Sequence, residues 1–385
     1  MKAKTFITSS IAAITAAIST HPALAQDTTS TEGGVIVVTG SIITRSDANS
    51  PSPISIVGAQ EITEAGTLNI TEVLKEDPSL GVTSRSNTNV LNGACASGVD
   101  MRNLGNRRTL ALVNGRRMPL FADAFGTAFQ DTTIIPSNLL ERVDILRDGA
   151  STTYGADAVA GVVNFILREK YDGLQVEGYT GISNRGDAFA YRISALAGHT
   201  WDRGSILFSA LYSDQDAPLL SDRDWAHPAI QSIGAVGSSN VVGSNNTPGG
   251  TILSASGQVL ECFPFSVGVI PHPSGCDWYD SAYETSLIND ITLRNVGFVG
   301  RYELTDNVRV FADVFQSRRE SSNEISATQI LTSTLTGIYP TGFRISAASA
   351  GNPYSQDINL RWRPSDYGSR PTFAVSNQFY ANVGL

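Results

Sequence analysis

Residues 135–164 read IPSNLLERVDILRDGASTTYGADAVAGVVN, and they combine two strand patterns with a turn of small residues. Val143 and Ile145 alternate with charged neighbours, which is the pattern of a strand with one buried face. An Asp-Gly pair ends this strand, and the apolar run at 162–167 follows the small-residue turn. The stretch therefore predicts short strands within one compact domain.

The chain upstream of this stretch supplies the rest of that domain. Residues 60–74 carry apolar positions at helical spacing, interrupted by a glycine, so one helix or two short ones are expected. Residues 109–113 (TLALV) predict a buried strand, and the following Asn114-Gly115 is the strongest short hairpin signal. We expect a domain of both α and β elements over residues 50–168.

Residues 174–385 change to long two-residue alternation of apolar and polar side chains. Tight turns fall at 201–204 and 305–307, and long excursions at 214–290 and roughly 319–357. Strands of about ten residues with short turns at one rim and long loops at the other are typical of an outer-membrane barrel. A soluble β-sandwich is the alternative, although its strands are usually shorter.

The N-terminal 25 residues have the three parts of a secretory signal peptide. Lys2 and Lys4 form a positive start, an apolar run of small residues follows, and residues 23–25 (ALA) form the cleavage pattern. A short buried helix would not need all three features in that order. Later residues contain no uninterrupted apolar run of the roughly 18 residues that a membrane-spanning helix needs. We expect an exported protein that crosses a membrane, if at all, by strands.

Residues 26–49 are expected to be a flexible segment with one strand-forming run. The run is Val35, Ile36, Val37, Val38 and Thr39, followed by a glycine. Such a run has high strand propensity and lacks an evident local partner, so it is a candidate for addition to the sheet edge of another protein. Pairing within its own domain is the alternative from the residues alone.

Cysteine usage agrees with export. Cys262 and Cys276 bracket an insert rich in proline and glycine, and we expect a disulfide there. Closing such a loop stabilises the fold by about 3 kcal/mol. Cys95 is left over, and a small buried side chain without chemistry is the simpler interpretation.

Two stretches of the compact domain resemble the plug domain of TonB-dependent outer-membrane receptors. They are residues 101–118 (MRNLGNRRTLALVNGRRM) and the stretch 135–164 quoted above. Residues 35–40 stand where that family carries its TonB box, which favours strand addition to TonB. One departure is Arg102-Asn103, where many relatives carry Arg-Gly; asparagine tolerates positive φ, so the turn is expected to survive. The resemblance covers roughly residues 35–385.

The resemblance implies an α+β plug domain followed by antiparallel transmembrane strands of a barrel of about 22 strands. The plug would be held in the polar lumen by breakable polar contacts, whereas a solvated surface is the alternative for its arginines. The residues expected to make plug–barrel polar contacts are Arg102, Arg107, Arg108, Arg116, Arg117, Glu141, Arg142, Asp144, Arg147 and Asp148.

The resemblance also implies energised uptake of a scarce ligand across the outer membrane of a Gram-negative cell. TonB, from the inner membrane, would grip residues 35–39 and pull on the plug. The partners implied are TonB, outer-membrane lipid and a small ligand such as a siderophore, a cobalamin-like compound or an oligosaccharide. The alternatives are a non-transporting adhesin or structural barrel, or a receptor that only binds its ligand.

Composition and motifs argue against other classes. With 16% charged and 41% hydrophobic residues the chain is not disordered, and a net charge of −9 gives no basic field for nucleic acid. No dinucleotide-binding, phosphate-loop, nucleophile-elbow or zinc-protease motif is present, so we expect no enzyme. The four histidines lack metal-ligand spacing, and neither a metal nor a cofactor is expected.

The length of the segment 174–385 limits how many barrel strands it can contain. The 212 residues from 174 to 385 hold six or seven recognisable strands. About 22 strands of about ten residues need roughly 220 residues before any loop is counted. We therefore expect the N-terminal part of a longer barrel protein, with a signal peptide (1–25), the box (35–40), a plug (50–168) and the first part of a wall (174–385).

Overall fold

The computed structural model describes most of the chain after residue 53. The described residues are 54–65, 68, 70–80, 95–122, 128–226, 230–232, 239–241, 247–266, 269–271, 275–328, 330–331 and 344–385. The expected signal peptide and TonB box lie outside these residues. No helix within them is long and apolar enough to cross a membrane.

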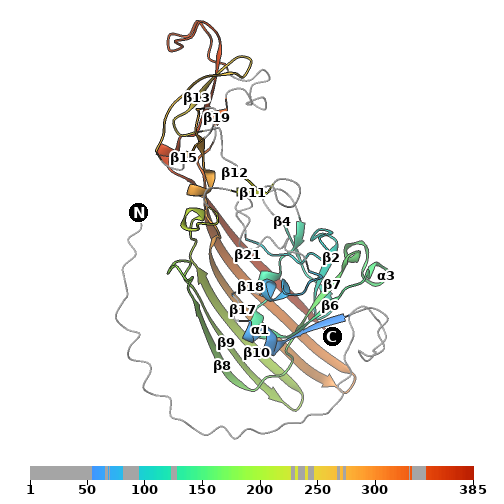
Figure 1. Cartoon of the computed structure of the whole chain (residues 1–385). Coiled ribbons are helices and arrows are strands. Elements are labelled where there is room, and N and C mark those ends of the chain that lie inside the picture. Colours follow the sequence, from blue (N-terminus) through green and yellow to red (C-terminus); the bar gives the residue numbers. More distant parts are fainter. Residues whose placement is uncertain are drawn as a thin grey trace, which may run out of the picture.

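Residues 54–168, which we call the plug region, are built on a five-stranded sheet (Figure 1). Its strands in order are β1 (Ile54–Gly58), β6 (Leu140–Leu146), β7 (Gly161–Leu167), β2 (Thr109–Val113) and β3 (Arg116–Arg117). β2 and β7 run parallel, and the other neighbours are antiparallel. The remaining elements include α1 (Ala59–Glu64), α2 (Ile70–Leu74), α3 (Ser151–Tyr154), and the pair β4 (Leu120–Ala122) and β5 (Ala128–Gln130).

The predicted elements of the plug region are confirmed with one difference. The helical stretch forms two short helices, and every residue of β2 is buried. Asn114 and Gly115 both have positive φ and close the β2–β3 hairpin. In β6, however, the last four residues are all buried, including Asp144. That strand has neighbours on both sides, and Arg142 Nε pairs with the Asp144 carboxylate at 3.0 Å, so the charge is compensated.

Six long strands form the second sheet, which we call the wall (Figure 1). They are β8 (Gly173–Gly181), β9 (Ala190–Trp201), β10 (Gly204–Gln215), β17 (Asp290–Thr305), β18 (Val308–Ile325) and β21 (Arg370–Gly384). Every neighbouring pair is antiparallel. Short turns at 202–203 and 306–307 mark one rim, and the longer connections 182–189, 216–289 and 326–369 leave the other, the long-loop rim. The predicted asymmetry of the two rims is confirmed.

The two faces of the wall differ in chemistry. Inward side chains lie against the plug region, where Leu196, Leu207, Val299 and Phe315 join plug residues such as Leu139 in one buried cluster. Polar side chains, mostly serine, asparagine and arginine, occupy many of the other inward positions. Outward positions alternate with these and expose large apolar side chains, among them Val176, Phe208, Val296, Phe379 and Val383.

The two longest connections form a separate set of small sheets beyond the long-loop rim (Figure 1). A four-stranded sheet contains β14 (Val259–Cys262), β13 (Thr251–Ser254), β20 (Ile358–Trp362) and β19 (Ile330–Leu331). Two-stranded pairs are β11 (Ile230–Ser232) with β12 (Ser239–Val241), and β15 (Val269–Ile270) with β16 (Trp278–Tyr279). Because β13 pairs with β20, connections 216–289 and 326–369 share one sheet.

Candidate functional site: the interface between plug and wall

A buried ion pair joins the plug region to the wall. Asp131 follows β5 and caps the short turn Thr132–Ile134, and Arg319 points inward from β18. Arg319 Nη1 lies 2.8 Å from Asp131 Oδ2, and the two side chains are 2% and 0% exposed. Asp131 also accepts hydrogen bonds from the backbone N–H groups of Ser97 and Thr133, both at 3.1 Å. The negative charge of Asp131 is therefore compensated by Arg319 of the wall and by backbone N–H groups of the plug region.

The electrostatic balance at Asp131 favours the charged carboxylate. Burial alone would raise the pKa of Asp131, but the Arg319 charge and the hydrogen bonds from Arg319, Ser97 and Thr133 outweigh it and lower the pKa. A carboxylate with a lowered pKa in the folded state stabilises that state above its ordinary pKa. This stabilisation is lost as the pH falls through the lowered value.

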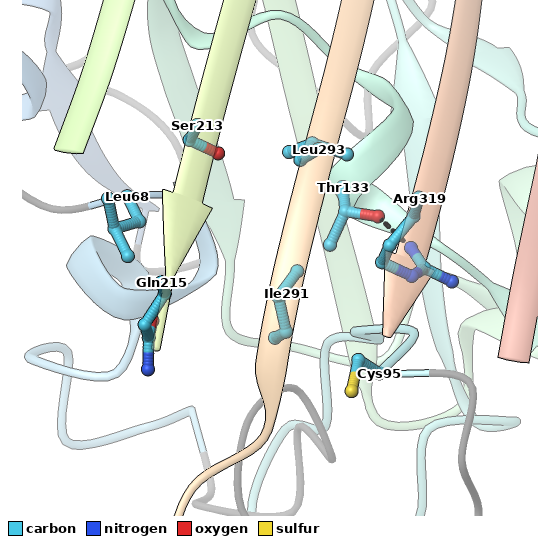
Figure 2. Close-up of a pocket in the computed structure, with 8 residues that line it drawn as sticks. All are labelled: Leu68, Cys95, Thr133, Ser213, Gln215, Ile291, Leu293 and Arg319. Atoms are coloured by element: carbon cyan, nitrogen blue, oxygen red, sulfur yellow. Dashed lines mark hydrogen bonds between the residues drawn. The ribbon is translucent and has the colours of Figure 1, made fainter. Parts of the chain in front are cut away.

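A small cavity lies beside this pair (Figure 2). It measures about 20 Å³, enough for a single water molecule. The plug region contributes Leu68, Cys95 and Thr133, and the wall contributes Ser213, Gln215, Ile291, Leu293 and Arg319. Figure 2 shows the Arg319 guanidinium donating to the Thr133 hydroxyl across this gap. Cys95 is buried here and unoxidised, and Asn289 Nδ2 donates to its Sγ at 2.9 Å.

The middle of the interface combines polar and apolar contacts. Asn138 donates from Nδ2 to the carbonyl oxygen of Ala195 at 2.9 Å and accepts from the Ser209 hydroxyl at 2.5 Å. Gly297 of β17 faces Leu139, and a Cβ built on this glycine would lie 2.5 Å from Leu139 Cδ1. A glycine is therefore required for the plug region to approach this strand so closely. The sequence predicted that polar contacts hold the plug region, but apolar side chains of the plug region and the wall also pack against each other here.

A third set of contacts lies near the point where the chain passes from the plug region to the wall. Glu169 pairs with Arg301 at 3.3 Å and with Arg309 at 2.5 Å. Burial raises the pKa of Glu169, but these two arginines outweigh it and lower the pKa. Arg301 Nη1 also lies 2.6 Å from Asp313, whose other carboxylate oxygen accepts from Asn114 Nδ2 at 3.2 Å. The β2–β3 turn and the segment that links the plug region to the wall are thus both bound to the same part of the wall.

Most of the residues predicted to make plug–barrel contacts interact within the plug region instead. Arg117 pairs with Asp157, Arg147 with Asp77, and Arg142 with both Glu141 and Asp144, all within the plug region. Arg102 and Arg108 donate to backbone carbonyl groups of the plug region, Asp148 accepts from its own neighbour Gly149, and Arg107 is exposed. Arg116 does reach the wall, where its guanidinium lies 4.0 Å from the centre of the Phe311 ring.

Different residues therefore carry most of the polar contact between plug and wall. Asp131, Asn138 and Glu169 were not singled out in the sequence because each is a single polar residue with no motif of its own, and Asn114 was identified only as part of a hairpin turn. Their wall partners lie more than 50 residues away along the chain. The turn expected at Arg102 and Asn103 is present, and both residues have positive φ.

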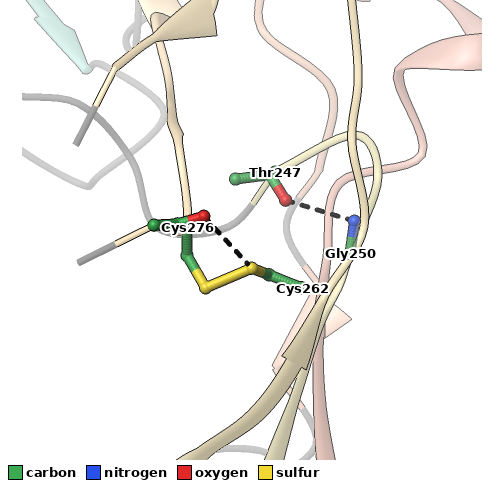
Figure 3. Close-up of a disulfide and its surroundings, with 5 residues drawn as sticks. Thr247, Gly250, Cys262 and Cys276 are labelled. Carbon is green, nitrogen blue, oxygen red and sulfur yellow. Dashed lines mark hydrogen bonds between the residues drawn. A yellow bond between two sulfur atoms is a disulfide. The ribbon is translucent and has the colours of Figure 1, made fainter. Parts of the chain in front are cut away.

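The loops carry the remaining predicted feature. Cys262 and Cys276 are joined by a disulfide, with 5.8 Å between their Cα atoms (Figure 3). Nearby, Thr247 Oγ1 accepts from the Gly250 N–H at 3.1 Å, and Trp362 Nε1 donates to the Pro248 carbonyl at 3.0 Å. Arg363 of the other loop is buried and lies 5.2 Å from the Tyr279 ring centre. Among the described residues no cluster of histidine, cysteine and carboxylate groups could hold a metal ion.

The plug region is thus a mixed sheet that packs on the inward face of a wall of long antiparallel strands. Residues 46–162 match the family model described as the TonB-dependent Receptor Plug Domain. The resemblance found in the sequence is confirmed: the chain carries a TonB-dependent receptor plug domain, followed by antiparallel sheets.

The chain is also similar to a curated outer-membrane protein and to two solved structures. An iron-regulated outer membrane virulence protein of Vibrio cholerae serotype O1 is 29% identical over 150 residues, covering 38% of this chain and 22% of that protein. The ferric enterobactin receptor of Pseudomonas aeruginosa is 15% identical with a TM-score of 0.47, covering 71% of this chain and 34% of that one. The siderophore receptor PirA of Acinetobacter baumannii is 15% identical with a TM-score of 0.45, covering 70% and 32%. The chain spans about a fifth to a third of the length of these relatives.

Proposed function

We propose that this chain acts in a TonB-dependent outer-membrane receptor that takes up a scarce ligand, and that it is not an enzyme. The wall would cross the outer membrane of a Gram-negative cell, reached through the N-terminal signal peptide. TonB would bind Val35, Ile36, Val37, Val38 and Thr39 as an added strand. Membrane lipid would surround the outward face of the wall.

One observation carries this proposal. The plug region covers the inward face of the wall, and the outward face exposes apolar side chains at alternate positions. A wall with a polar interior and an apolar exterior fits a membrane with the plug inside it. The match of residues 46–162 to the plug family supports the same assignment.

The topology of the plug sheet suggests where a pull would act first. Among the described residues β1 is an edge strand that pairs only with β6, and it is the first described element after the proposed TonB box. Tension on the N-terminal segment would therefore separate β1 from β6 before reaching the interior strands. The Asp131–Arg319 pair lies on a different part of the plug region and would keep that part seated.

We propose a siderophore, an iron-chelating compound, as the ligand. The support is that the Vibrio cholerae relative is described as iron-regulated. Cobalamin-like compounds and oligosaccharides are the competing classes. Binding measurements with labelled ferric siderophores, cobalamin and oligosaccharides would separate the three, because only the cognate class should saturate at low concentration.

The role of the TonB box is tested by replacing Val37 with proline. Proline removes a backbone donor that an added strand needs, so V37P should abolish ligand uptake while leaving ligand binding unchanged. Uptake is measured as cell-associated labelled ligand after an external wash. T29P, in the polar segment before the box, is the matched control and should take up ligand normally. Undiminished uptake by V37P would contradict the proposal and favour a non-transporting adhesin or a receptor that only binds.

A further inference from the structure

The two longest connections of the wall share one sheet, and each contributes half of it. The first connection (216–289) supplies β14 and β13, and the second connection (326–369) supplies β20 and β19, in that order across the sheet. The junction is the central pair, in which all four residues of β13 are paired with β20. Figure 1 shows this sheet beyond the long-loop rim. The two connections therefore cannot separate without breaking the ladder between β13 and β20.

A turn before β13 holds the residue that follows β20. The backbone N–H of Arg363 donates to the carbonyl oxygen of Thr247 at 3.0 Å. The same turn contacts the end of β14, because the Phe263 N–H donates to the carbonyl oxygen of Gly250 at 3.1 Å. Figure 3 shows Thr247 and Gly250 beside Cys262. The first connection thus holds Arg363 next to one of its two cysteines.

The segment after the other cysteine contacts the same arginine. Tyr279 of β16 follows Cys276 closely, is 0% exposed, and has its ring centre 5.2 Å from the Arg363 guanidinium. Arg363 is 1% exposed, and its Nη1 donates to the Ser326 hydroxyl and to the Ala327 carbonyl oxygen, both at 2.7 Å. A buried guanidinium is costly unless the groups around it stay in place. Tyr279 and Arg363 are therefore expected to stay together.

The Cys262–Cys276 disulfide connects these two contacts. Cys262 ends β14, beside the turn at 247–250, and Cys276 lies just before β16. Without the bond, the two cysteines would be joined only by a chain of 14 positions, and closing such a loop costs conformational entropy. With the bond, the turn and β16 stay close to each other, and both contact Arg363.

We propose that the Cys262–Cys276 disulfide of the first connection locks the second connection in place, so that the two connections form one unit. The bond then acts across two parts of the chain that lie far apart in the sequence, and not only within its own loop. This inference goes beyond the proposed function and does not depend on the nature of the ligand. Under the proposed function, a ligand that contacts either connection meets a surface that both connections shape.

The test is trypsin digestion of the full chain in detergent micelles, with each cleaved bond quantified by mass spectrometry. In the second connection trypsin can cut after Arg344 and after Arg361, whereas Arg363 precedes a proline and is not cut. Arg344 is exposed, but Arg361 lies in β20 with paired strands on both sides. We expect the unmodified chain to be cut after Arg344 only. C262S/C276S should be cut after Arg361 about tenfold faster, because cleavage follows the population of the opened chain.

Y279A removes the aromatic contact with the disulfide intact, and it should also speed cleavage after Arg361. Y367A, at an 86% exposed tyrosine of the second connection, is the matched control and should leave Arg361 protected. Cleavage after the buried Arg301 of β17 reports on the wall and should stay slow in every variant.

Three results would overturn the proposal. The first is a C262S/C276S variant in which Arg361 stays as protected as in the unmodified chain. The second is an unmodified chain that is cut after Arg344 and Arg361 at equal rates, since the second connection would then not be held. The third is faster cleavage after Arg301 in C262S/C276S, because the bond would then stabilise the whole fold and not the junction of the two connections.

Discussion

At the scale of single residues, Asp131 and Arg319 hold each other across the plug–wall boundary with almost no exposure to solvent. Such a pair contributes little net stability as a pair, because both charges have lost their hydration. Removing one partner is much more costly, because it leaves the other charge buried and uncompensated.

D131N should therefore destabilise the protein strongly. The change keeps the side-chain shape but leaves Arg319 without its counter-charge, so the free energy of unfolding should fall by about 3–5 kcal/mol. Denaturant unfolding in detergent micelles is the measurement. D148N, at an exposed carboxylate of the plug region, is the control and should change stability by less than about 0.5 kcal/mol.

The same pair predicts a pH dependence. Because the pKa of Asp131 is lowered in the folded protein, its stabilisation is present above the ordinary pKa near 3.8 and disappears as the pH falls through the lowered value. D131N should lack this acid-dependent loss. An acid unfolding profile of D131N identical to that of the unmodified chain would contradict the assignment.

The residue scale is also where sequence reasoning was least successful. Arg117 and Arg147 stand among apolar strands, and nothing local distinguishes an arginine that pairs within the plug region from one that reaches the wall. Arg319 lies where the sequence predicts the start of a long excursion, whereas β18 continues to Ile325 and Arg319 keeps its inward position in the alternation. Partners that lie far apart in the chain are fixed by packing, which a single sequence does not contain.

At the scale of elements, periodicity was a better guide. The strand at 109–113, the hairpin at Asn114-Gly115 and the long alternating strands are all present, because each depends on a local pattern. The small sheets of the loops were not predicted. Strands of two to five residues, such as β15 and β16, are too short to show a period.

The close approach of η4 (Ser137–Leu139) to β17 depends on Gly297. G297A would place a methyl group about 2.5 Å from Leu139 Cδ1, so the buried Leu139 side chain and its neighbours must shift, at a cost of about 1–3 kcal/mol. G178A on β8 meets no atom within 4 Å and is the matched control. Thermal unfolding in micelles should show a lower midpoint for G297A only. Equal midpoints for the two variants would mean that the plug region does not pack on β17 as described.

At the scale of the whole molecule, the plug region and the wall are held together by both an apolar cluster and polar contacts. The sequence predicted the two parts and their order but not this apolar seam, because buried residues of the two sheets come from distant segments. If the protein transports a ligand past the plug, these contacts must break and form again in each cycle. A covalent link across the interface should then stop transport without preventing ligand binding.

The most direct test is a disulfide between the plug region and the wall. Asn138 and Ser209 are in hydrogen-bond contact, and N138C/S209C would link η4 to β10. The measurement is uptake of labelled ligand before and after oxidation, with each single cysteine variant and the reduced, unmodified chain as controls. We predict that the oxidised double variant binds ligand but takes up none, and that a reductant restores uptake. Normal uptake with the link fully formed would contradict a plug that must rearrange in the wall.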